Sequence, residues 1–420
     1  MKTIPFVRYA ASLLFLVPVT ALRAWDYEGH QIVNRLALES LPKGDFPDFV
    51  LTSDSARDRI AFLAGEPDRW KSTPDLPIKH YNGVDHYLDL EEVSEAGLDP
   101  HTISSLRYDF VVQFAAGRAA HSDKFPPIDP KKNLEHSREW PGFAPWAITE
   151  YYGKLKAAFS YLKAFQEQNQ GQQLGTSVEV TNAKDNIIYL MGIMGHYVGD
   201  CAQPLHVTMH HNGWVGPNPN GYTTWSGIHA WIDGGLIGKT GINWKALTPQ
   251  ITPSQAIVLA PQADGRDPMF VDVMNYLLGS LDQVEPLYRL EKDHKFGDDF
   301  AKGPKTGQDT ETVSAEGRAF VEAQLVRGGE KLGAIWLTAW RNSPPDAYLR
   351  AQLLKRQASA GPVDPRPAVE YWASSHSSKH LYHKSTCEWA QKIKESNKVV
   401  FKTKEEAEAA GYVPCDTCKP

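Results

Sequence analysis

The sequence predicts a mainly α-helical protein that ends in a small α+β zinc-binding unit. Three observations support this fold class. Apolar residues recur at helical spacing over long stretches of residues 25–350, strand-like alternation is scarce there, and three of the four cysteines fall in the last 34 residues. With 42% hydrophobic and 22% charged residues, the chain has the composition of an ordinary globular protein. We therefore expect one large helical domain and a much smaller second domain.

Residues 1–24 have the pattern of a signal peptide. Lys2 and Arg8 supply positive charge, an apolar stretch over residues 10–22 is too short to span a bilayer, and Ala24 is a small residue before the expected cut. Cleavage one or two residues away is the alternative, because Leu22 stands where a small residue is usual. We expect a secreted or periplasmic protein without stable membrane insertion, whose mature chain is predicted to begin at residue 25.

The apolar pattern then predicts the principal helices in chain order. Apolar residues lie three or four positions apart, as a buried helix face requires, in residues 32–41, 146–165, 187–198 and 313–340. Stretches rich in Gly and Pro predict loops at residues 124–130 and 214–221. A stretch rich in Pro, Ala, Ser and Gly predicts a linker over residues 351–370. The predicted domains are therefore residues 25–350 and 371–420.

The charge distribution limits how the large domain can bind phosphates. The whole chain has a formal net charge of −6, and residues 1–24 and 371–420 contribute +3 and +2, so the segment between them carries −11. A protein of this charge has no excess of Lys and Arg with which to hold a polyanion by counterion release alone. Bound cations or a few local basic residues must supply the attraction.

Two pairs with the same spacing mark the strongest candidate site. His196 and Asp200 are four residues apart, and so are His229 and Asp233. Residues four apart share one face of a helix, so each pair can offer two ligands to one ion. A single pair of this kind is more often a hydrogen-bonded couple. The repetition of the pair, together with the ligands described next, favours a cluster of metal ions.

Two further sources of ligands accompany these pairs. Cleavage before Trp25 exposes an α-amine, which can converge with the carbonyl oxygen of Trp25 and the imidazole of His30 on one cation. Pro204 ends the helix of the first pair and lets His206 turn toward a neighbouring site. A cut at another position would remove the amine ligand.

Less specific candidates lie in two upstream segments. The residues concerned are Asp68, Arg69 and Lys71, then His86, Tyr87 and Asp89. An isolated Asp beside Arg is usually a surface ion pair, and an isolated His beside Tyr is usually packed or solvated. His80 is an alternative to His86.

Taken in order, these motifs resemble those of the zinc-dependent S1/P1 nucleases, a mostly helical family that shares its fold with bacterial zinc phospholipase C. The motifs run from residue 25 to residue 233. The phospholipases usually carry Glu where Asp233 stands and a longer gap before the first His, which favours the nuclease branch. The resemblance implies three zinc ions, with these ligands: Asp68, His86, His196 and Asp200; Trp25 and His30 with bridging Asp200; and His206, His229 and Asp233.

The resemblance also implies an activity. Two close zinc ions lower the pKa of a shared water, and a third neutralises charge on the phosphate and on the departing 3′-oxygen. Asp68 would orient or deprotonate the water, and Lys71 would hold the phosphate. Arg69 would help to hold it, with a solvent-facing charge as the alternative. Tyr87 would stack on a base and Asp89 would bind its edge. The expected substrates are single-stranded DNA or RNA, cut to 5′-phosphorylated products, and 3′-nucleotides.

Two other function classes stay open, a zinc-dependent phospholipase C and a non-catalytic zinc or nucleic-acid binding protein. Residues 90–140 depart from the family pattern as a long insertion, which bears on the base pocket and on strand preference. His210 and His211 are expected to be exposed loop residues, and Cys201 is expected to be a small buried residue without a redox role.

The C-terminal residues form a second motif. Cys415-x-x-Cys418, with His383-x-x-x-Cys387 upstream, has the ligand types and spacings of a closed tetrahedral zinc site. The alternative to a zinc site, a disulfide between two of these three cysteines, would leave the third unpaired. The segment resembles the small metal-binding domains of the Ada protein, with His383 where a first Cys stands there. Fifty residues make a poor core, so we expect one zinc ion to supply much of the folding free energy.

Overall fold

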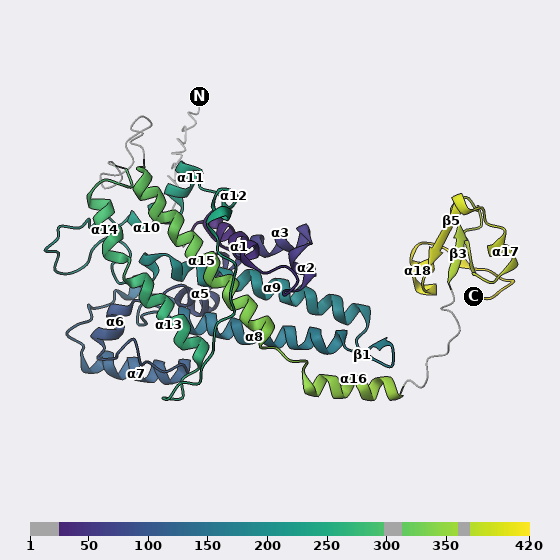
Figure 1. The fold of residues 1–420 in the computed structure, drawn as a ribbon, viewed down its shortest axis with the longest axis horizontal. Coiled ribbons are helices and arrows are strands. Elements are labelled where there is room, and N and C mark those ends of the chain that lie inside the picture. The colour runs from purple at the N-terminus through teal and green to yellow at the C-terminus, as the bar shows by residue number, and fades with distance from the viewer. Residues whose placement is uncertain (1–24, 298–312, 360–369) are drawn as a thin grey trace, which may run out of the picture. The chain divides into compact units, whose positions relative to one another are not determined.

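The computed structural model describes residues 25–297, 313–359 and 370–420. The predicted signal peptide, residues 1–24, lies outside the described residues. The chain divides into two compact units, with the boundary between Leu354 and Lys355. The first unit is helical, and the second contains a small sheet, so the coarse fold class predicted from the sequence is confirmed (Figure 1). In the parts of the chain described, every helix is too short or too polar to cross a membrane.

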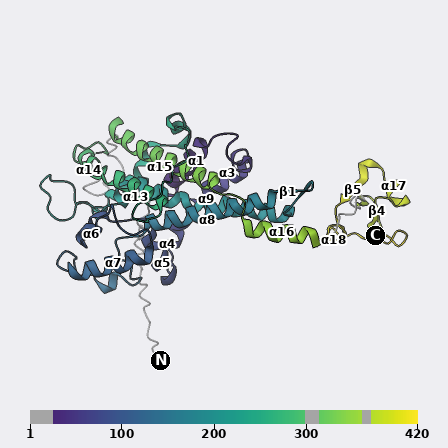
Figure 2. The ribbon, with the colours of Figure 1, turned by 60° about the horizontal axis from the view of Figure 1, so that its bottom comes forward.

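Four long helices form the frame of the large unit. They are α1 (Tyr27–Ser40), α8 (Ala144–Gln166), α9 (Ser177–Ala202) and α15 (Ala315–Arg341). The most extensive contacts join α1 to α15 and α8 to α9, and α15 also packs on α9 (Figures 1 and 2). Gly329 lets α15 approach α1 closely, because a Cβ there would lie 2.6 Å from that of Leu36. The buried faces of these helices share one apolar core.

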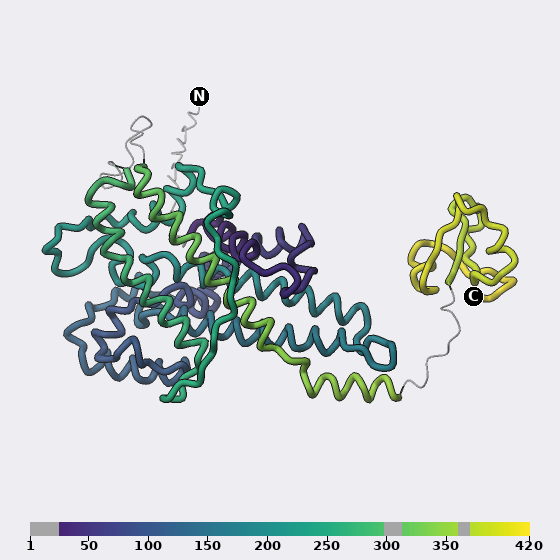
Figure 3. The backbone as a smooth tube through the Cα atoms, in the orientation of Figure 1, coloured from purple at the N-terminus to yellow at the C-terminus, as the bar shows by residue number. Residues whose placement is uncertain are grey.

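Helix α9 carries the most ligand candidates, and its ends are defined by its sequence. Thr176 accepts a hydrogen bond from the backbone N–H of Glu179, whose side chain returns to the backbone of Thr176, a capping box at the N-terminus. At the other end Gln203 and Pro204 stop the helix. A short hairpin of β1 (Gln168–Asn169) and β2 (Gln172–Gln173) connects α8 to α9, as the backbone trace shows (Figure 3).

Shorter elements complete the large unit. Before α8 these are α2 (Asp48–Leu51), α3 (Asp54–Leu63), α4 (Glu66–Lys71), α5 (Leu76–Gly83), η1 (Val84–His86), α6 (Leu90–Glu95), α7 (Arg107–Ala120) and η2 (Pro130–Lys132). After α9 these are η3 (Pro204–His206), α10 (Ile228–Ala230), η4 (Trp231–Gly235), α11 (Leu236–Thr240), α12 (Trp244–Leu247), η5 (Thr248–Gln250), α13 (Pro268–Leu281), α14 (Val284–Lys292) and α16 (Ala347–Ser359).

The four predicted helical stretches fall almost entirely within the four long helices, and both predicted loops lack α-helix. Two details differ from the expectation. The predicted linker begins too early, since residues 351–359 continue α16; their Ala, Leu, Arg and Gln residues favour helix, and the prolines start only at Pro362. Pro74 and Pro77 are loop-forming residues in the sequence between Asp68 and His86, but Pro77 lies in the first turn of α5, where a missing N–H costs nothing.

The C-terminal unit contains a four-stranded sheet in the order β5-β3-β4-β6. Its strands are β3 (Tyr371–Ser374), β4 (Leu381–Lys384), β5 (Lys398–Phe401) and β6 (Val413–Pro414), and its helices are α17 (Glu388–Gln391), η7 (Glu395–Asn397) and α18 (Lys404–Ala409). Strand β3 pairs antiparallel with β4 and β5, and β6 runs parallel to β4. Ala373, Tyr382 and Ala407 form the buried apolar cluster of this unit.

Candidate metal centres

The start of α1 lies against the end of α9, which brings the predicted N-terminal ligands to the first His–Asp pair. Trp25 is fully buried, and its indole N–H donates to the carbonyl of Gly199 at 2.7 Å. The backbone N–H of Asp26 donates to the carbonyl of Asp233 at 3.1 Å. The ring of His30 stacks on that of His196, with centroids 3.8 Å apart. Residues 25–30 therefore lie beside both His–Asp pairs.

Two ligand groups share His196. In one, the Nε2 atom of His30 lies 3.4 Å from Oδ1 of Asp200, and the Nε2 atom of His196 lies 3.2 Å from Oδ2 of the same carboxylate. The other contains His86, whose Nδ1 lies 2.8 Å from Nε2 of His196 and 3.0 Å from Asp200, and Asp68, whose Oδ1 is 3.8 Å from His196. Each group gathers three ligand atoms within 4.8 Å of one another.

A third group lies beside the first two. The Nε2 atom of His229 is 3.0 Å from Nε2 of His206 and 2.9 Å from Oδ2 of Asp233. Asp233 stands in η4, a single turn of π-helix, a local irregularity often found at functional sites. The Nδ1 atom of His206 lies 3.8 Å from Oδ1 of Asp200. The structure thus brings the predicted side-chain ligands of the main domain into one connected cluster.

Neighbouring backbone and side-chain groups orient these ligands. The Nδ1–H of His196 donates to the carbonyl of Ala64 at 2.7 Å, and that of His206 donates to the carbonyl of His86 at 3.0 Å. These bonds leave Nε2 of both rings facing the cluster. Gln203, fully buried, donates from Nε2 to Oδ1 of Asp233 at 2.5 Å and accepts from the backbone N–H of Leu205. Such outer contacts are typical of metal ligands.

Buried polar atoms without hydrogen-bond partners support a cation in this cluster. Within the described residues, this holds for both ring nitrogens of His30, Nε2 of His86, Oδ1 of Asp200 and Oδ2 of Asp233. A buried polar atom left unsatisfied costs about 1–3 kcal/mol. Three of these atoms, Nε2 of His30, Oδ1 of Asp200 and Oδ2 of Asp233, face other ligand atoms of the cluster, where a cation would compensate this cost. The donor set of imidazole and carboxylate is one that zinc accepts.

The pKa shifts of the buried imidazoles and carboxylates also favour a bound cation. Burial lowers the pKa of His86 to about 3 and that of His30 well below its usual value, so both rings are neutral and able to bind metal. Burial acts to raise the pKa of Asp200, but His196 and His206 outweigh it and lower that pKa far below its ordinary range. Asp200 and Asp233 in turn raise the pKa of His206 against the effect of burial. The two carboxylates that favour a proton on His206 would equally attract a metal cation.

A cavity of about 690 Å³ opens onto the cluster. His86, His206 and His229 line it, and so does Lys71, whose Nζ lies 2.8 Å from Oδ1 of Asp68. Burial raises the pKa of Asp68, but Lys71 and the surrounding imidazoles lower it far more, so this carboxylate is ionised. The cavity therefore combines imidazoles with an ammonium group, while the ionised carboxylate of Asp68, bound to Lys71, lines a separate cavity of about 280 Å³.

Tyr87 and Asp89 also line the cavity, beside the ligand groups. Gly142 makes room for this segment: its φ is +107°, and a Cβ there would collide with the carbonyl oxygen of Tyr87. Burial raises the pKa of Asp89 well above its usual value, with further contributions from Glu92 and Glu91. Burial therefore favours the protonated form of Asp89 over the carboxylate.

Arg69 does not reach this cavity. Its guanidinium pairs with Glu66 and lies over the rings of Phe62 and Tyr27, at 4.8 and 5.4 Å from their centroids. It lines a separate cavity of about 280 Å³. His80 lies away from the cluster as well, since its Nδ1–H donates to the carbonyl of Glu135 at 2.6 Å.

The sequence assigned no role to several residues in or near the cavity. His211, expected to be an exposed loop residue, lines the cavity 3.9 Å from Asp89, and His210 stacks on Trp214 with ring centroids 3.9 Å apart. The long insertion supplies a wall of the cavity that includes Arg118, Phe125, Lys132, Arg138 and Trp140. No local spacing in the sequence distinguishes these residues from ordinary surface side chains.

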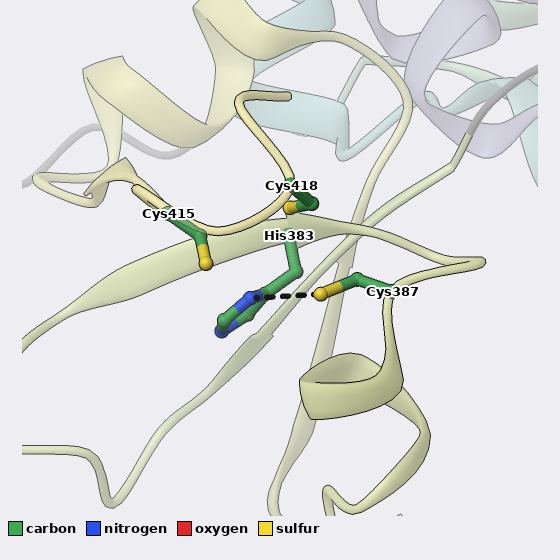
Figure 4. A group of neighbouring side chains, drawn as sticks. All are labelled: His383, Cys387, Cys415 and Cys418. Atoms are coloured by element: carbon green, nitrogen blue, oxygen red, sulfur yellow. Dashed lines mark hydrogen bonds between the residues drawn. The ribbon is translucent and has the colours of Figure 1, made fainter.

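The C-terminal unit holds a separate ligand group of His383, Cys387, Cys415 and Cys418 (Figure 4). His383 lies on β4, Cys387 precedes α17, and Cys415 follows β6. The Sγ atom of Cys387 is 3.7 Å from Nδ1 of His383. Burial lowers the pKa of His383, which keeps its ring neutral. One His and three Cys make the donor set of a closed tetrahedral zinc site.

Comparison with known proteins identifies this small unit. Residues 365–420 match the family described as the metal binding domain of Ada. The match and the four converging ligands together confirm that the C-terminal segment is a metal-binding domain of the kind that holds zinc. No curated protein matches the chain. For the helical unit, the family resemblance stays a prediction from its own residues.

Proposed function

We propose that the helical unit is a zinc-dependent phosphodiesterase that cuts single-stranded DNA or RNA to 5′-phosphorylated products and removes 3′-phosphates from nucleotides. One observation supports this above the others. Three His–carboxylate groups, linked through His196 and Asp200, form a cluster, and three of its imidazoles, those of His86, His206 and His229, line a cavity that also contains Lys71 and Tyr87. The formation of 5′-phosphorylated rather than 3′-phosphorylated products is implied by the motif resemblance alone.

The residues divide into three roles in this proposal. Three zinc ions would be held by the three groups, with the mature amine and carbonyl of Trp25 completing the His30 group, and would supply Lewis acidity and charge neutralisation. Asp68, ionised beside Lys71, would orient the attacking water or accept its proton. The ammonium of Lys71 also binds a phosphate oxygen. The ring of Tyr87 stacks on a base.

The C-terminal domain has a structural role in this proposal. Its four ligands form a closed site, which leaves no open position for chemistry. We therefore propose that its single zinc ion maintains the fold of residues 370–420.

One assay tests the proposal against its two alternatives. Purified protein is given single-stranded DNA, a 3′-nucleotide and phosphatidylcholine, each with and without a chelator. Chelator-sensitive hydrolysis of the first two is expected. Hydrolysis of the lipid alone would favour a phospholipase C. A non-catalytic binding protein would hydrolyse none of the three substrates, and it would contain a single zinc ion that is lost when residues 371–420 are deleted. Metal analysis should find about four zinc ions per chain.

A second experiment tests the N-terminal ligand and the proposed export to a periplasm or exterior. Mass spectrometry of exported protein should find Trp25 as the first residue. A chain extended by one alanine before Trp25 has no amine at the cluster, and its activity should fall about 10–100-fold. Full activity of the extended chain would remove the amine from the proposed ligands.

A further inference from the structure

The cavity has a second cationic region, apart from Lys71. Lys79, Lys132 and Arg138 all line it, and none of them has an ion pair within the described residues. Lys71, in contrast, is paired with Asp68. Three unpaired cations facing one cavity are available to bind an anion.

The two cationic regions lie in different parts of the cavity. Lys71 lies beside the metal cluster, because its Nζ is 2.8 Å from Oδ1 of Asp68, which is itself 3.8 Å from Nε2 of His196. Arg138 lies in the segment that leads to Pro141, whose carbonyl accepts a hydrogen bond from the backbone N–H of Asp89 at 2.7 Å, and to Gly142, which lies against Tyr87. Arg138 therefore lies nearer the proposed base platform, and Lys71 lies nearer the metal cluster.

The segment that carries two of these cations is fixed in place. Asn133, buried, accepts hydrogen bonds at Oδ1 from the backbone N–H groups of Ser137 and Arg138 at 3.1 and 3.0 Å. Its amide donates to the carboxylate of Glu139 at 2.7 Å. The hydrogen bond from His80 to the carbonyl of Glu135 joins this segment to α5, which carries Lys79. Such pre-organisation reduces the entropy cost of binding.

Carboxyl groups in the same cavity are engaged or weakly charged. Asp129 accepts a hydrogen bond from the backbone N–H of Lys131 at 3.0 Å, and Glu135 accepts one from the hydroxyl of Ser137 at 3.2 Å. Burial raises the pKa of Glu92 to about 7. Lys79, Lys132 and Arg138, together with Arg118, outnumber the carboxylates of Asp129 and Glu135 in this wall, so the wall keeps a net positive charge.

We propose that Lys79, Lys132 and Arg138 form a second phosphate site, which binds the 5′-phosphate of the nucleotide whose base stacks on Tyr87. This inference rests on the proposed function. A nucleotide carries its 3′- and 5′-phosphates on opposite sides of the sugar. With the 3′-phosphate at Lys71 and the base on Tyr87, the 5′-phosphate reaches the region of Arg138. Nucleotides with a 5′-phosphate, including internal residues of a strand, are then the preferred substrate class.

The test compares two substrates that differ in one group, a nucleoside 3′-phosphate and the corresponding 3′,5′-bisphosphate. The zinc-loaded full chain should hydrolyse the 3′-phosphate of the bisphosphate with a kcat/KM about 10-fold higher or more, as a charge-assisted contact allows. In the double variant Lys132→Ala/Arg138→Ala, this ratio should fall to near one. Arg138→Glu should reverse the preference.

The matched control is Lys131→Ala, since Lys131 is exposed, adjacent in sequence and absent from the cavity wall. It should keep the wild-type ratio. A ratio taken within each variant is insensitive to partial loss of folded protein. Equal rates on both substrates in the wild type, or an unchanged ratio in the double variant, would overturn the second phosphate site alone. Hydrolysis of neither substrate would overturn the proposed function together with this inference.

Discussion

The two units hold their ligands by different means. In the helical unit, His30, His196 and Asp200 are fully buried on α1 and α9, which belong to one large apolar core. In the C-terminal unit, the apolar cluster has three buried residues, and its ligands come from a strand, the start of a short helix and a loop. A large core can hold polar ligands in place without metal, whereas a small core cannot. Zinc should therefore control reactivity in the first unit and folding in the second.

The largest expected effect is on the small unit. Cys415→Ser removes one of four ligands, and loss of the metal should cost residues 370–420 about 10 kcal/mol of folding free energy. Hydrogen exchange should show β4 unprotected while α1 and α9 keep their protection. Asp416→Ser, at an exposed neighbouring position, is the control. If β4 stays protected in the Cys415 variant, the small unit does not depend on zinc for its folding, and the proposed difference between the two units is wrong.

The next effect is on activity without unfolding. Asp200→Asn removes an ionised carboxylate that contacts His30, His86 and His196. Hydrolysis of single-stranded DNA should fall at least about 1,000-fold, which corresponds to about 4 kcal/mol of transition-state stabilisation. Circular dichroism should show the helices retained. Asp185→Asn, exposed on the same helix, should have full activity. Activity of the Asp200 variant within tenfold of wild type would argue against a shared bridging ligand.

A smaller effect is expected from an orienting contact. Gln203→Ala removes the hydrogen bond to Asp233 but leaves every proposed ligand in place. Zinc affinity of the helical unit should fall about 10–100-fold in a titration against a competing chelator. The C-terminal site should keep its affinity, since it has its own ligands. Equal weakening of both sites would show that the variant acts through general destabilisation.

The smallest effect concerns the cavity wall and its pH dependence. Burial raises the pKa of Glu92 to about 7, whereas in the unfolded chain this group titrates near 4.5. The folded protein then binds more protons between these values, so stability falls as pH rises through them. Glu92→Gln should raise the free energy of unfolding by about 1 kcal/mol at pH 8 and little at pH 4. Urea denaturation at both pH values measures this; an equal change at both would exclude titration as the cause.

The sequence determined the local relations between ligands. The four-residue spacing of His196 with Asp200 and of Cys387 with His383, and the Cys-x-x-Cys pattern, followed from short-range geometry of the chain. Apolar periodicity likewise predicted the long helices. The linker boundary was misplaced because a proline-rich stretch says little about the residues just before its first proline.

Only the tertiary structure decided which distant residues meet. The stacking of His30 on His196, the placement of Arg69 in a separate cavity and the cationic wall around Arg138 depend on how helices and loops pack. Packing is set by shape and burial over the whole core, so no local pattern contains it. The sequence alone specified the kinds of ligand and their spacing along each element, and the fold determined how these elements meet to form one cluster facing one cavity.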